Sequence, residues 1–414
     1  MKAHQGLEHI VFESSDLPRI IHAIAALRPK SRNYKELKVR FIHAIGRISD
    51  TALITERIAY LKDAYAAAGD TSLFQNAVVM ALSRTQHADS YRLLRKFMTE
   101  NPPVFANARE YQDLLVHLDD SLQLARTLFP DILQLTSVED YKVPITRLLY
   151  RLVDSGYIDA AGYADYYTKL YFDAQIQSKK QQNRQDEEPS ATAPNNIQEL
   201  MNMQMTLQRT AATEQITLVN YATLLMPFYD QKENLPPFFD KLVRSSDKPT
   251  RLAMVALLAK NNKPIPDTIL TSLGESDKHR VQLYERLKRV KRLDLFPAAW
   301  ATQEAMARSV LLNAKSYPKF TEIVPMGKEF VTAKNHTGYV YFFKYRLQAN
   351  GDWLMGISGL QPADLHEIND SHELLTRTEK KIDATNPEKE FHDRLDQLLT
   401  SQHRSATSFY TVVR

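Results

Sequence analysis

The sequence predicts a mainly α protein, in which an irregular array of helices is followed by a small C-terminal α+β unit with an antiparallel sheet. Before about Tyr317, apolar residues recur at helical spacing, so each segment would carry them on one face. After Tyr317 the apolar period shortens to two. The stretch YVYFFKYRLQANGDWLMGISGLQP then surrounds an Asn-Gly turn with aromatic and aliphatic runs, as a β-hairpin does.

Composition narrows the class of protein. The chain has 414 residues, 43% hydrophobic and 25% charged, which is typical of a soluble globular protein. Its net charge of +4 is small for this length and defines no class of partner. Cysteine is absent, so disulfides, thiolate metal sites and cysteine nucleophiles are excluded. The sequence contains neither a P-loop motif nor G-x-G-x-x-G, and we expect no cofactor.

No apolar run reaches the roughly 18 residues of a membrane span, and the N-terminal stretch lacks the features of a signal peptide. We therefore expect a soluble chain, while its compartment and oligomeric state stay open. No polar cap precedes the predicted array. This leaves open whether the chain is part of a longer protein.

The helical pattern is clearest in two segments. Lys35–Ile48 places Leu37, Phe41, Ile45 and Ile48 on one stripe, and Pro144–Val153 does the same with Ile145, Leu148, Leu149 and Leu152. Asp-Ser-Gly follows at 154–156 and is typical of a helix C-cap and turn.

Two segments far apart in the chain resemble each other. One is DTSLFQNAVVMALSRTQHADSYRLLRKFM, from Asp70, and the other is DKPTRLAMVALLAKNNKPIPDTILTSL, from Asp247. Each reads as a helix, a polar turn and a second helix, with Asp89 and Asp267 suited to cap the second helix. The pattern resembles HEAT-type helical repeats over roughly residues 35–310. That resemblance implies an α-solenoid-like array. The irregular spacing keeps a compact multi-helix bundle open as an alternative.

These patterns divide the chain into four parts. Residues 1–182 form the first part of the array, and residues 197–316 form the second part. Between them, residues 183–196 (NRQDEEPSATAPNN) carry prolines and acidic residues but no large apolar side chain, which predicts a linker or loop. Residues 317–414 form the α+β unit. The helix predicted for Ile197–Met226 would present Met201, Met205, Leu218 and Leu225.

The C-terminal unit is predicted to contain four strands and one helix. The strands are expected at Lys328–Lys334, Tyr339–Leu347, Trp353–Leu360 and Ser408–Val413, and the helix at Glu388–Leu399. A loop at Gln348–Asp352 would pair Leu347 with Trp353, Tyr345 with Met355, Phe343 with Ile357 and Tyr341 with Gly359. We expect this apolar face to pack on the helix. The opposite face, basic near the turn through Lys344 and Arg346, is a candidate for contact with a partner.

Two helical segments supply further candidates for partner binding. Tyr163, Tyr167 and Tyr171 are spaced i, i+4, i+8 and form a stripe suited either to packing or to an interaction surface. The stretch KHRVQLYERLKRVKR, residues 278–292, docks through Leu283, Leu287 and Val290. Arg280, Lys288 and Arg292 are then expected to point outward, with Arg286 and Arg289 flanking them, as a solvated face or as a strip that binds polyanions.

No catalytic residues can be assigned. HEINDSHE, starting at His366, gathers His366 and His372 with acidic residues, but their spacing matches no known metal site, so no metal is expected. A polar loop is the simpler interpretation.

Three functions follow as hypotheses. The first is a non-enzymatic scaffold that binds a protein partner on its helical-repeat surface, with the α+β unit as a cap or second contact. The second is an enzyme or a protein that binds a small ligand or metal in the α+β unit. The third is binding of nucleic acid or another polyanion through residues 278–292.

Overall fold

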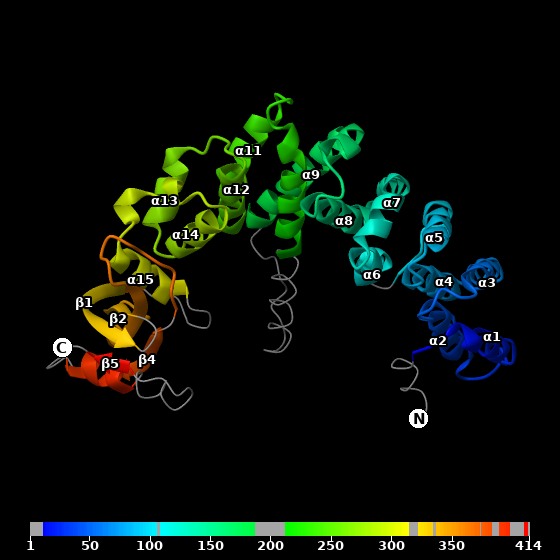
Figure 1. The fold of residues 1–414 in the computed structure, drawn as a ribbon, viewed down its shortest axis with the longest axis horizontal. Helices are drawn as coiled ribbons and strands as arrows, with labels where there is room; N and C mark the ends of the chain where they lie inside the picture. The colour runs from blue at the N-terminus through cyan, green and yellow to red at the C-terminus, as the bar shows by residue number, and fades with distance from the viewer. Residues whose placement is uncertain are drawn as a thin grey trace. The chain divides into compact units, whose positions relative to one another are not determined.

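The computed structural model describes residues 11–105, 108–186, 212–313, 322–333, 337–372, 374–382, 389–397 and 410–412. It confirms the fold class: a mainly α chain with a C-terminal α+β unit built on an antiparallel sheet (Figure 1). The chain divides into two compact units, Met1–Leu235 and Pro236–Arg414. Within the described residues, none of the helices has the length and apolar character needed to cross a membrane.

Helices of the first unit follow one another with short connections. They are α1 (Leu17–Ala25), α2 (Tyr34–Gly46), α3 (Ile54–Ala66), α4 (Ser72–Arg84), α5 (Ala88–Glu100), α6 (Ala108–Asp119), α7 (Leu122–Leu133), α8 (Lys142–Asp154) and α9 (Tyr167–Asp186), with a further helix at residues 212–225. From α1 to α8, the helices that pack on each other are neighbours in sequence or are separated by one helix. One row is formed by α2, α4, α6 and α8, and another by α3, α5 and α7. This pattern is typical of a helical array stacked in sequence order.

The predicted apolar stripes are the buried faces of these helices. In α8, Ile145, Leu148, Leu149 and Leu152 are all buried. In α2, Ile45 is buried, and Gly46 allows close approach of α4, since a Cβ atom there would lie 2.5 Å from the Ala81 carbonyl oxygen. The turn predicted after α8 is present, with Gly156 at a φ of 72°.

The helix caps differ from the prediction. His87, not Asp89, is the N-cap of α5, because its ring accepts a hydrogen bond from the Asp89 backbone amide and Ser90 completes a capping box. Pro266 is the N-cap of α13, and Asp267 is the first helical residue. Both aspartates therefore lie in the first turn, where their charge still favours the helix dipole.

The predicted linker lies mostly outside the described residues. Its first four residues, 183–186, belong to the end of α9. Met201 and Met205 also lie outside the described residues, whereas Leu218 and Leu225 are buried in the helix at 212–225.

The second unit continues the helical pattern and then changes to a sheet. Its helices are α11 (Leu235–Val243), which starts at the boundary, α12 (Lys248–Lys260), α13 (Asp267–Glu275), α14 (Arg280–Arg289) and α15 (Gln303–Asn313). α14 packs on α12, α13 and α15, and α15 packs on the sheet. The sheet order is β4-β3-β2-β1-β5, with β1 (Glu322–Ala333), β2 (Thr337–Arg346), β3 (Leu354–Pro362), β4 (Thr376–Lys381) and β5 (Tyr410–Val412).

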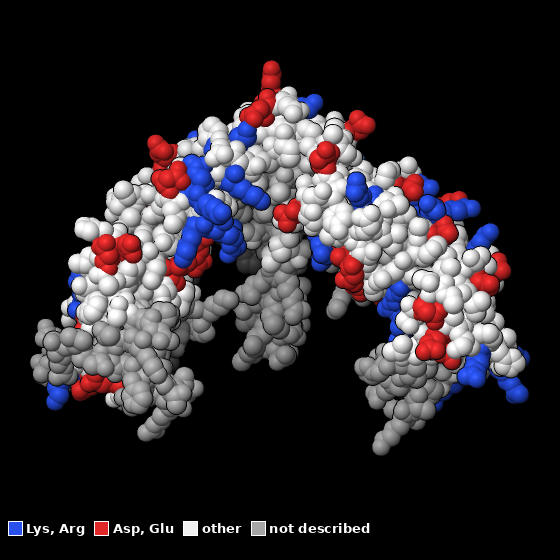
Figure 2. Space-filling model, viewed as in Figure 1, with Lys and Arg blue, Asp and Glu red and all other residues white. Residues whose placement is uncertain are grey.

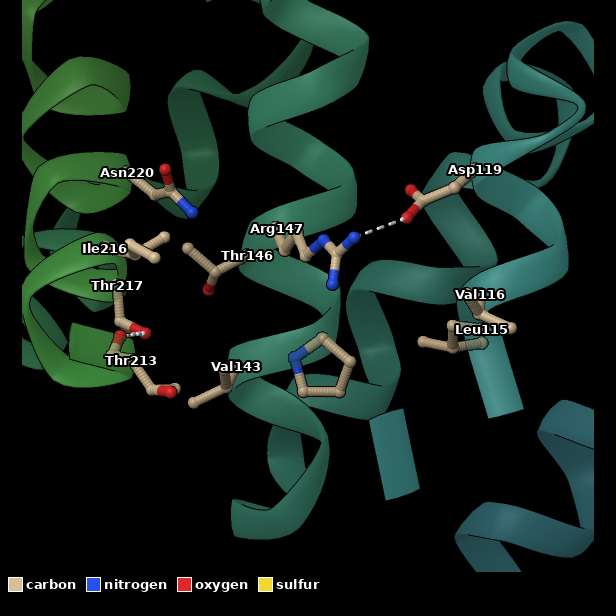
Figure 3. Close-up of a pocket in the computed structure, with 11 residues that line it drawn as sticks. Leu115, Val116, Asp119, Val143, Thr146, Arg147, Thr213, Ile216, Thr217 and Asn220 are labelled. Carbon is tan, nitrogen blue, oxygen red and sulfur yellow. Dashed lines mark hydrogen bonds and ion pairs between the residues drawn. The ribbon is translucent and has the colours of Figure 1, made fainter. Parts of the chain in front are cut away.

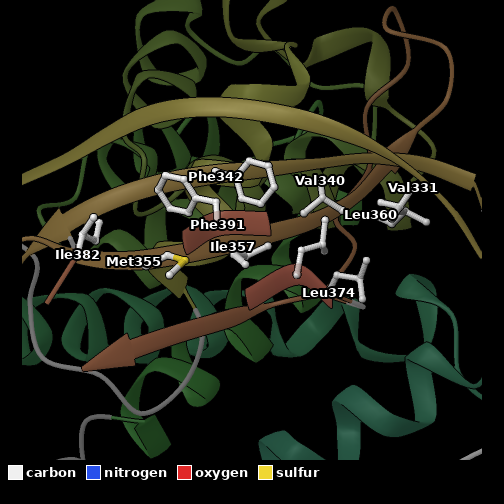
Figure 4. Packing of buried hydrophobic residues seen from close by; sticks show 10 residues of the cluster. Val331, Val340, Phe342, Met355, Ile357, Leu360, Leu374, Ile382 and Phe391 are labelled. Atoms are coloured by element: carbon white, nitrogen blue, oxygen red, sulfur yellow. The ribbon is translucent and has the colours of Figure 1, made fainter. Parts of the chain in front are cut away.

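Both faces of the sheet are covered, which corrects the predicted packing. Tyr341, Phe343 and Tyr345 of β2 pack against Ala307 and Leu311 of α15 rather than on the C-terminal helix. The opposite face packs on the helical residues 389–397, where the Phe342 and Phe391 rings stack at 5.2 Å (Figure 4). An antiparallel sheet buried on both sides needs apolar residues on both faces, and β2 provides them.

The predicted hairpin register is wrong by one residue. Tyr345 pairs with Leu354, Phe343 with Gly356 and Tyr341 with Ser358. Gly356 is what this register requires, because a Cβ atom there would lie 2.5 Å from the Leu311 side chain of α15. Trp353 consequently precedes β3, and the Lys344 and Arg346 side chains each lie 4.7 Å from its ring.

Candidate functional site

The strongest candidate site is a cleft in the first unit, between three helices. It has a volume of about 460 Å³ and is lined by Leu115, Val116 and Asp119 of α6, Val143, Pro144, Thr146 and Arg147 of α8, and Thr213, Ile216, Thr217 and Asn220 of the helix at 212–225 (Figure 3). Pockets of this size are within the range that holds a small ligand or a few side chains of a partner.

Apolar side chains are exposed on two walls of the cleft. Ile216 is 59% exposed and Val143 is 37% exposed. Ile216 lies outside the buried stripe of its own helix, which consists of Leu218, Tyr221 and Leu225. Leaving two branched aliphatic side chains in water beside a concave surface is unfavourable, and such patches mark interaction sites.

Asn220 contributes a polar side chain to the wall of the cleft. It is 9% exposed, and its amide side chain has no hydrogen-bond partner among the described residues. Thr217, by contrast, donates its hydroxyl to the Thr213 carbonyl oxygen at 2.8 Å. The amide lines the cleft, where a ligand that offers both a donor and an acceptor could form hydrogen bonds with it.

Charge at the rim of the cleft is positive. Arg147 and Arg151 both pair with the Asp119 carboxylate, at 3.5 and 3.2 Å, and Asp119 is 10% exposed while Arg147 is 57% exposed. Two guanidinium groups share one carboxylate, so one positive charge is left uncompensated. The rim therefore favours a negatively charged group next to the apolar floor.

The position of α8 in this cleft is set by a polar cluster at its start. Lys142 pairs with Asp173 of α9 at 3.3 Å and with Glu139 at 2.5 Å. Lys169 donates to the Thr136 carbonyl and hydroxyl oxygens at 2.5 and 2.8 Å. These bonds join α8, α9 and the turn before α8, so the cleft walls are held by internal polar contacts.

The three tyrosines of the predicted stripe are brought together, but as packing residues. Tyr163 lies in a 3₁₀ segment (Ala160–Tyr166) before α9, is 2% exposed and donates its hydroxyl to the Leu224 carbonyl at 3.0 Å. Burial raises its pKa to about 12. Tyr167 donates to the Asn234 side chain at 2.8 Å, and Tyr171 stacks on Tyr167 and accepts from Gln175. Their binding to a partner stays a prediction.

Arg280 does not point outward, which corrects the prediction. It is 1% exposed and donates to the carbonyl oxygens of Gly274 at 2.7 Å, Glu275 at 3.0 Å and Ala305 at 2.7 Å, and to the Asp277 carboxylate at 2.7 Å. The guanidinium also lies 4.9 Å from the Trp300 ring. These contacts cap the end of α13 and join it to α15.

The other basic candidates also have internal partners. Lys288 pairs with Asp370 at 2.8 Å, and Arg292 pairs with Asp294 and donates to the Asn262 side chain at 2.7 Å. Arg346 pairs with Glu322 across β1 and β2. A protein partner would therefore compete with existing acceptors at all three positions.

A second cavity, of about 440 Å³, lies in the second unit and brings together two residues that the sequence suggested, Lys288 and His372. It is lined by Lys288, Thr337, Leu360, Gln361, Pro362, Asn369, Asp370, Ser371 and His372. Its polar groups mostly bond one another: Asn369 donates to Leu360 and accepts from Ser371, while Gln361 exchanges two bonds with the Asn369 backbone. His366 is exposed and does not line it. Within the described residues, no group of three or more histidines and acids is arranged to hold a metal.

Sequence reasoning missed the cleft because its residues come from three separate segments. The available signal was Ile216, an aliphatic residue that falls off the apolar stripe of its helix. Comparisons with known proteins do not alter this assignment: the chain matches no protein-family model, no curated protein sequence and no solved structure.

Proposed function

We propose that this protein is a non-enzymatic interaction scaffold that binds a segment of a protein partner in the cleft between α6, α8 and the helix at 212–225. The single observation that carries the proposal is the wall of this cleft, where the exposed Ile216 and Val143 lie with Asn220, whose amide forms no hydrogen bond with a described residue. A peptide backbone offers the donor and acceptor that this amide needs. The resemblance to HEAT-type repeats supports the same interpretation.

The partner segment is expected to combine apolar and acidic residues. Ile216 and Val143 would cover one or two aliphatic side chains of the partner, since burial of apolar area drives most such contacts. An aspartate or glutamate next to them would reach Arg147, whose charge is incompletely matched by Asp119. An amphipathic helix with an acidic flank has this chemistry.

The test is a selection of random peptides displayed on phage against the full chain, followed by titration of the enriched peptides. We expect peptides with aliphatic residues at helical spacing and an acidic flank. Ile216→Asp should weaken them at least about tenfold, because it places a charge on the apolar wall. Phe172→Asp is the matched control, since Phe172 is 58% exposed, close to the 59% of Ile216, and does not line the cleft.

Asn220→Ala separates the role of the amide from that of the apolar wall. It should weaken the same peptides without the change in charge that Ile216→Asp introduces. Enriched peptides that bind Ile216→Asp and Asn220→Ala as tightly as the unmodified chain would refute the cleft as the binding site.

A further inference from the structure

A strongly basic surface lies over α12 and α14 of the second unit, where Lys and Arg side chains gather in Figure 2. It overlaps the stretch 278–292 that the sequence suggested, but does not include Arg280, Lys288 or Arg292. Its members are Lys248, Arg251, Lys278, Arg286 and Arg289. We refer to these five residues as the cationic face.

Three of the cations, from the start of α12 and the turn before α14, lie around the His279 side chain. His279 is 6% exposed, and its burial, followed by the charges of Lys248, Lys278 and Arg251, lowers its pKa. Lys248 and Arg251 come from the start of α12, and Lys278 precedes α14. The tertiary fold, not the sequence of one helix, therefore produces this concentration of charge.

The remaining two cations extend the cationic face along α14. Arg286 and Arg289 are three residues apart and so lie on one side of the helix. Burial and the charge of Arg289 both lower the pKa of Arg286, which means that the guanidinium is partly desolvated beside a like charge. This arrangement is unfavourable unless an anion approaches.

The structure provides little internal compensation for these charges. The side chains of Lys248, Lys278, Arg286 and Arg289 form no ion pair or hydrogen bond with any other described residue. Arg251 donates to the Ser245 carbonyl oxygen at 2.8 and 3.1 Å, which orients the guanidinium but does not neutralise it. The nearest acids in sequence are Asp247, which caps α12 through the Thr250 amide, Asp277, which pairs with Arg280 and Arg308, and Glu285, which influences Arg286 without forming an ion pair.

We propose that the cationic face binds an acidic segment of a protein partner. From Arg280 to Arg289, α14 rises about 14 Å, which matches roughly four residues of an extended chain. A guanidinium group binds a carboxylate through two parallel hydrogen bonds. The cationic face contains two half-buried guanidinium groups, those of Arg251 and Arg286. Tyr284, the aromatic residue of α14, is buried and donates its hydroxyl to the Ile368 carbonyl oxygen, so it offers no stacking surface for the bases of single-stranded nucleic acid. This favours an acidic protein segment over nucleic acid.

The experiment measures binding of a fluorescein-labelled octaglutamate peptide to the full chain by anisotropy, at about 50 mM salt, where the Debye length exceeds 10 Å. The test variant is Arg286→Gln with Arg289→Gln. The matched control is Lys288→Gln with Arg292→Gln, which removes the same charge from the same stretch, but at side chains that already have internal partners. Tryptophan fluorescence of each variant shows whether the unit is folded, since Trp300 and Trp353 both lie in it.

We expect the test variant to weaken peptide binding at least about tenfold and the control variant to change it less than about threefold. Arg286→Lys with Arg289→Lys keeps the charge and should recover part of the affinity. Equal losses in the test and control variants, or no binding by the unmodified chain, would overturn the proposal. Tighter binding of an oligothymidylate of equal charge would overturn the choice of an acidic protein segment. Ile216→Asp should leave peptide binding here unchanged, so failure of this proposal and failure of the cleft are distinguishable.

Discussion

Replacing Arg280 with methionine should destabilise the second unit strongly, although the residue lies in a stretch that reads as a basic surface. Methionine fills a similar volume but donates no hydrogen bonds. The substitution would leave the carbonyl oxygens of Gly274, Glu275 and Ala305 without their donor in a site where the side chain is 1% exposed. Asp277 keeps a second partner, because Arg308 pairs with it at 2.8 Å.

The magnitude follows from these contacts. Hydrogen bonds to a charged group contribute about 1.5–3 kcal/mol each, and the desolvation cost of the guanidinium offsets part of that gain. Burial lowers the pKa of Arg280, which reflects this cost. With three carbonyl groups losing this charged donor and the carboxylate still paired, we expect a loss of roughly 3–5 kcal/mol in the free energy of unfolding.

The assay is urea denaturation of the full chain followed by tryptophan fluorescence, which reports on the second unit alone because both tryptophans lie there. Lys288→Met is the control: Lys288 is 52% exposed and its pair with Asp370 is a surface pair, worth at most about 1 kcal/mol. If Arg280→Met and Lys288→Met unfold at the same urea concentration, the hydrogen bonds of Arg280 do not stabilise the second unit as argued.

Three further substitutions test the packing of the two units. Burial lowers the pKa of His43 to about 4, with Arg84 and Arg47 contributing, so the unfolded state takes up the proton first as the pH falls below 6.5. The free energy of unfolding of the first unit should therefore fall by about 2 kcal/mol between pH 8 and pH 5. His43→Gln should remove this pH dependence in urea denaturation followed by circular dichroism. An unchanged pH dependence in the variant would contradict the burial of His43. Gly46→Ala should destabilise the first unit by about 1–3 kcal/mol, because the new Cβ atom meets the Ala81 backbone, and a neutral result would mean that α2 and α4 are less closely packed. Gly356→Val should destabilise the second unit by a similar amount through its contact with Leu311, measured by tryptophan fluorescence, and an unchanged midpoint would contradict the observed register.

The sequence predicted those features that depend on local periodicity. α8 and its C-terminal turn follow from the spacing of Ile145, Leu148 and Leu152, because an amphipathic helix buries that stripe wherever it docks. The existence of the hairpin follows in the same way from its aromatic runs and its turn. Its register did not follow, because β2 is apolar on both faces and no polar face distinguishes one pairing from its neighbour.

The features that the sequence did not predict depend on partners distant in the chain. Arg280 reads as a surface residue until α13 and α15 present their carbonyl groups to it. β4 was missed since its residues, TRTEKK, are charged and polar, as is common in edge strands. The cleft around Asn220 needs three helices from three segments, and no pattern within one of them predicts it.

The central claim is that the first unit binds a protein partner in the cleft, and site-specific photo-cross-linking tests it most directly. Benzoylphenylalanine would replace Ile216 in one preparation of the full chain and Phe172 in another, each exposed to an extract of the source organism. The account predicts one protein cross-linked at position 216, absent at position 172 and lost when Asn220→Ala is added. No cross-link at position 216, or the same set of proteins at both positions, would contradict it.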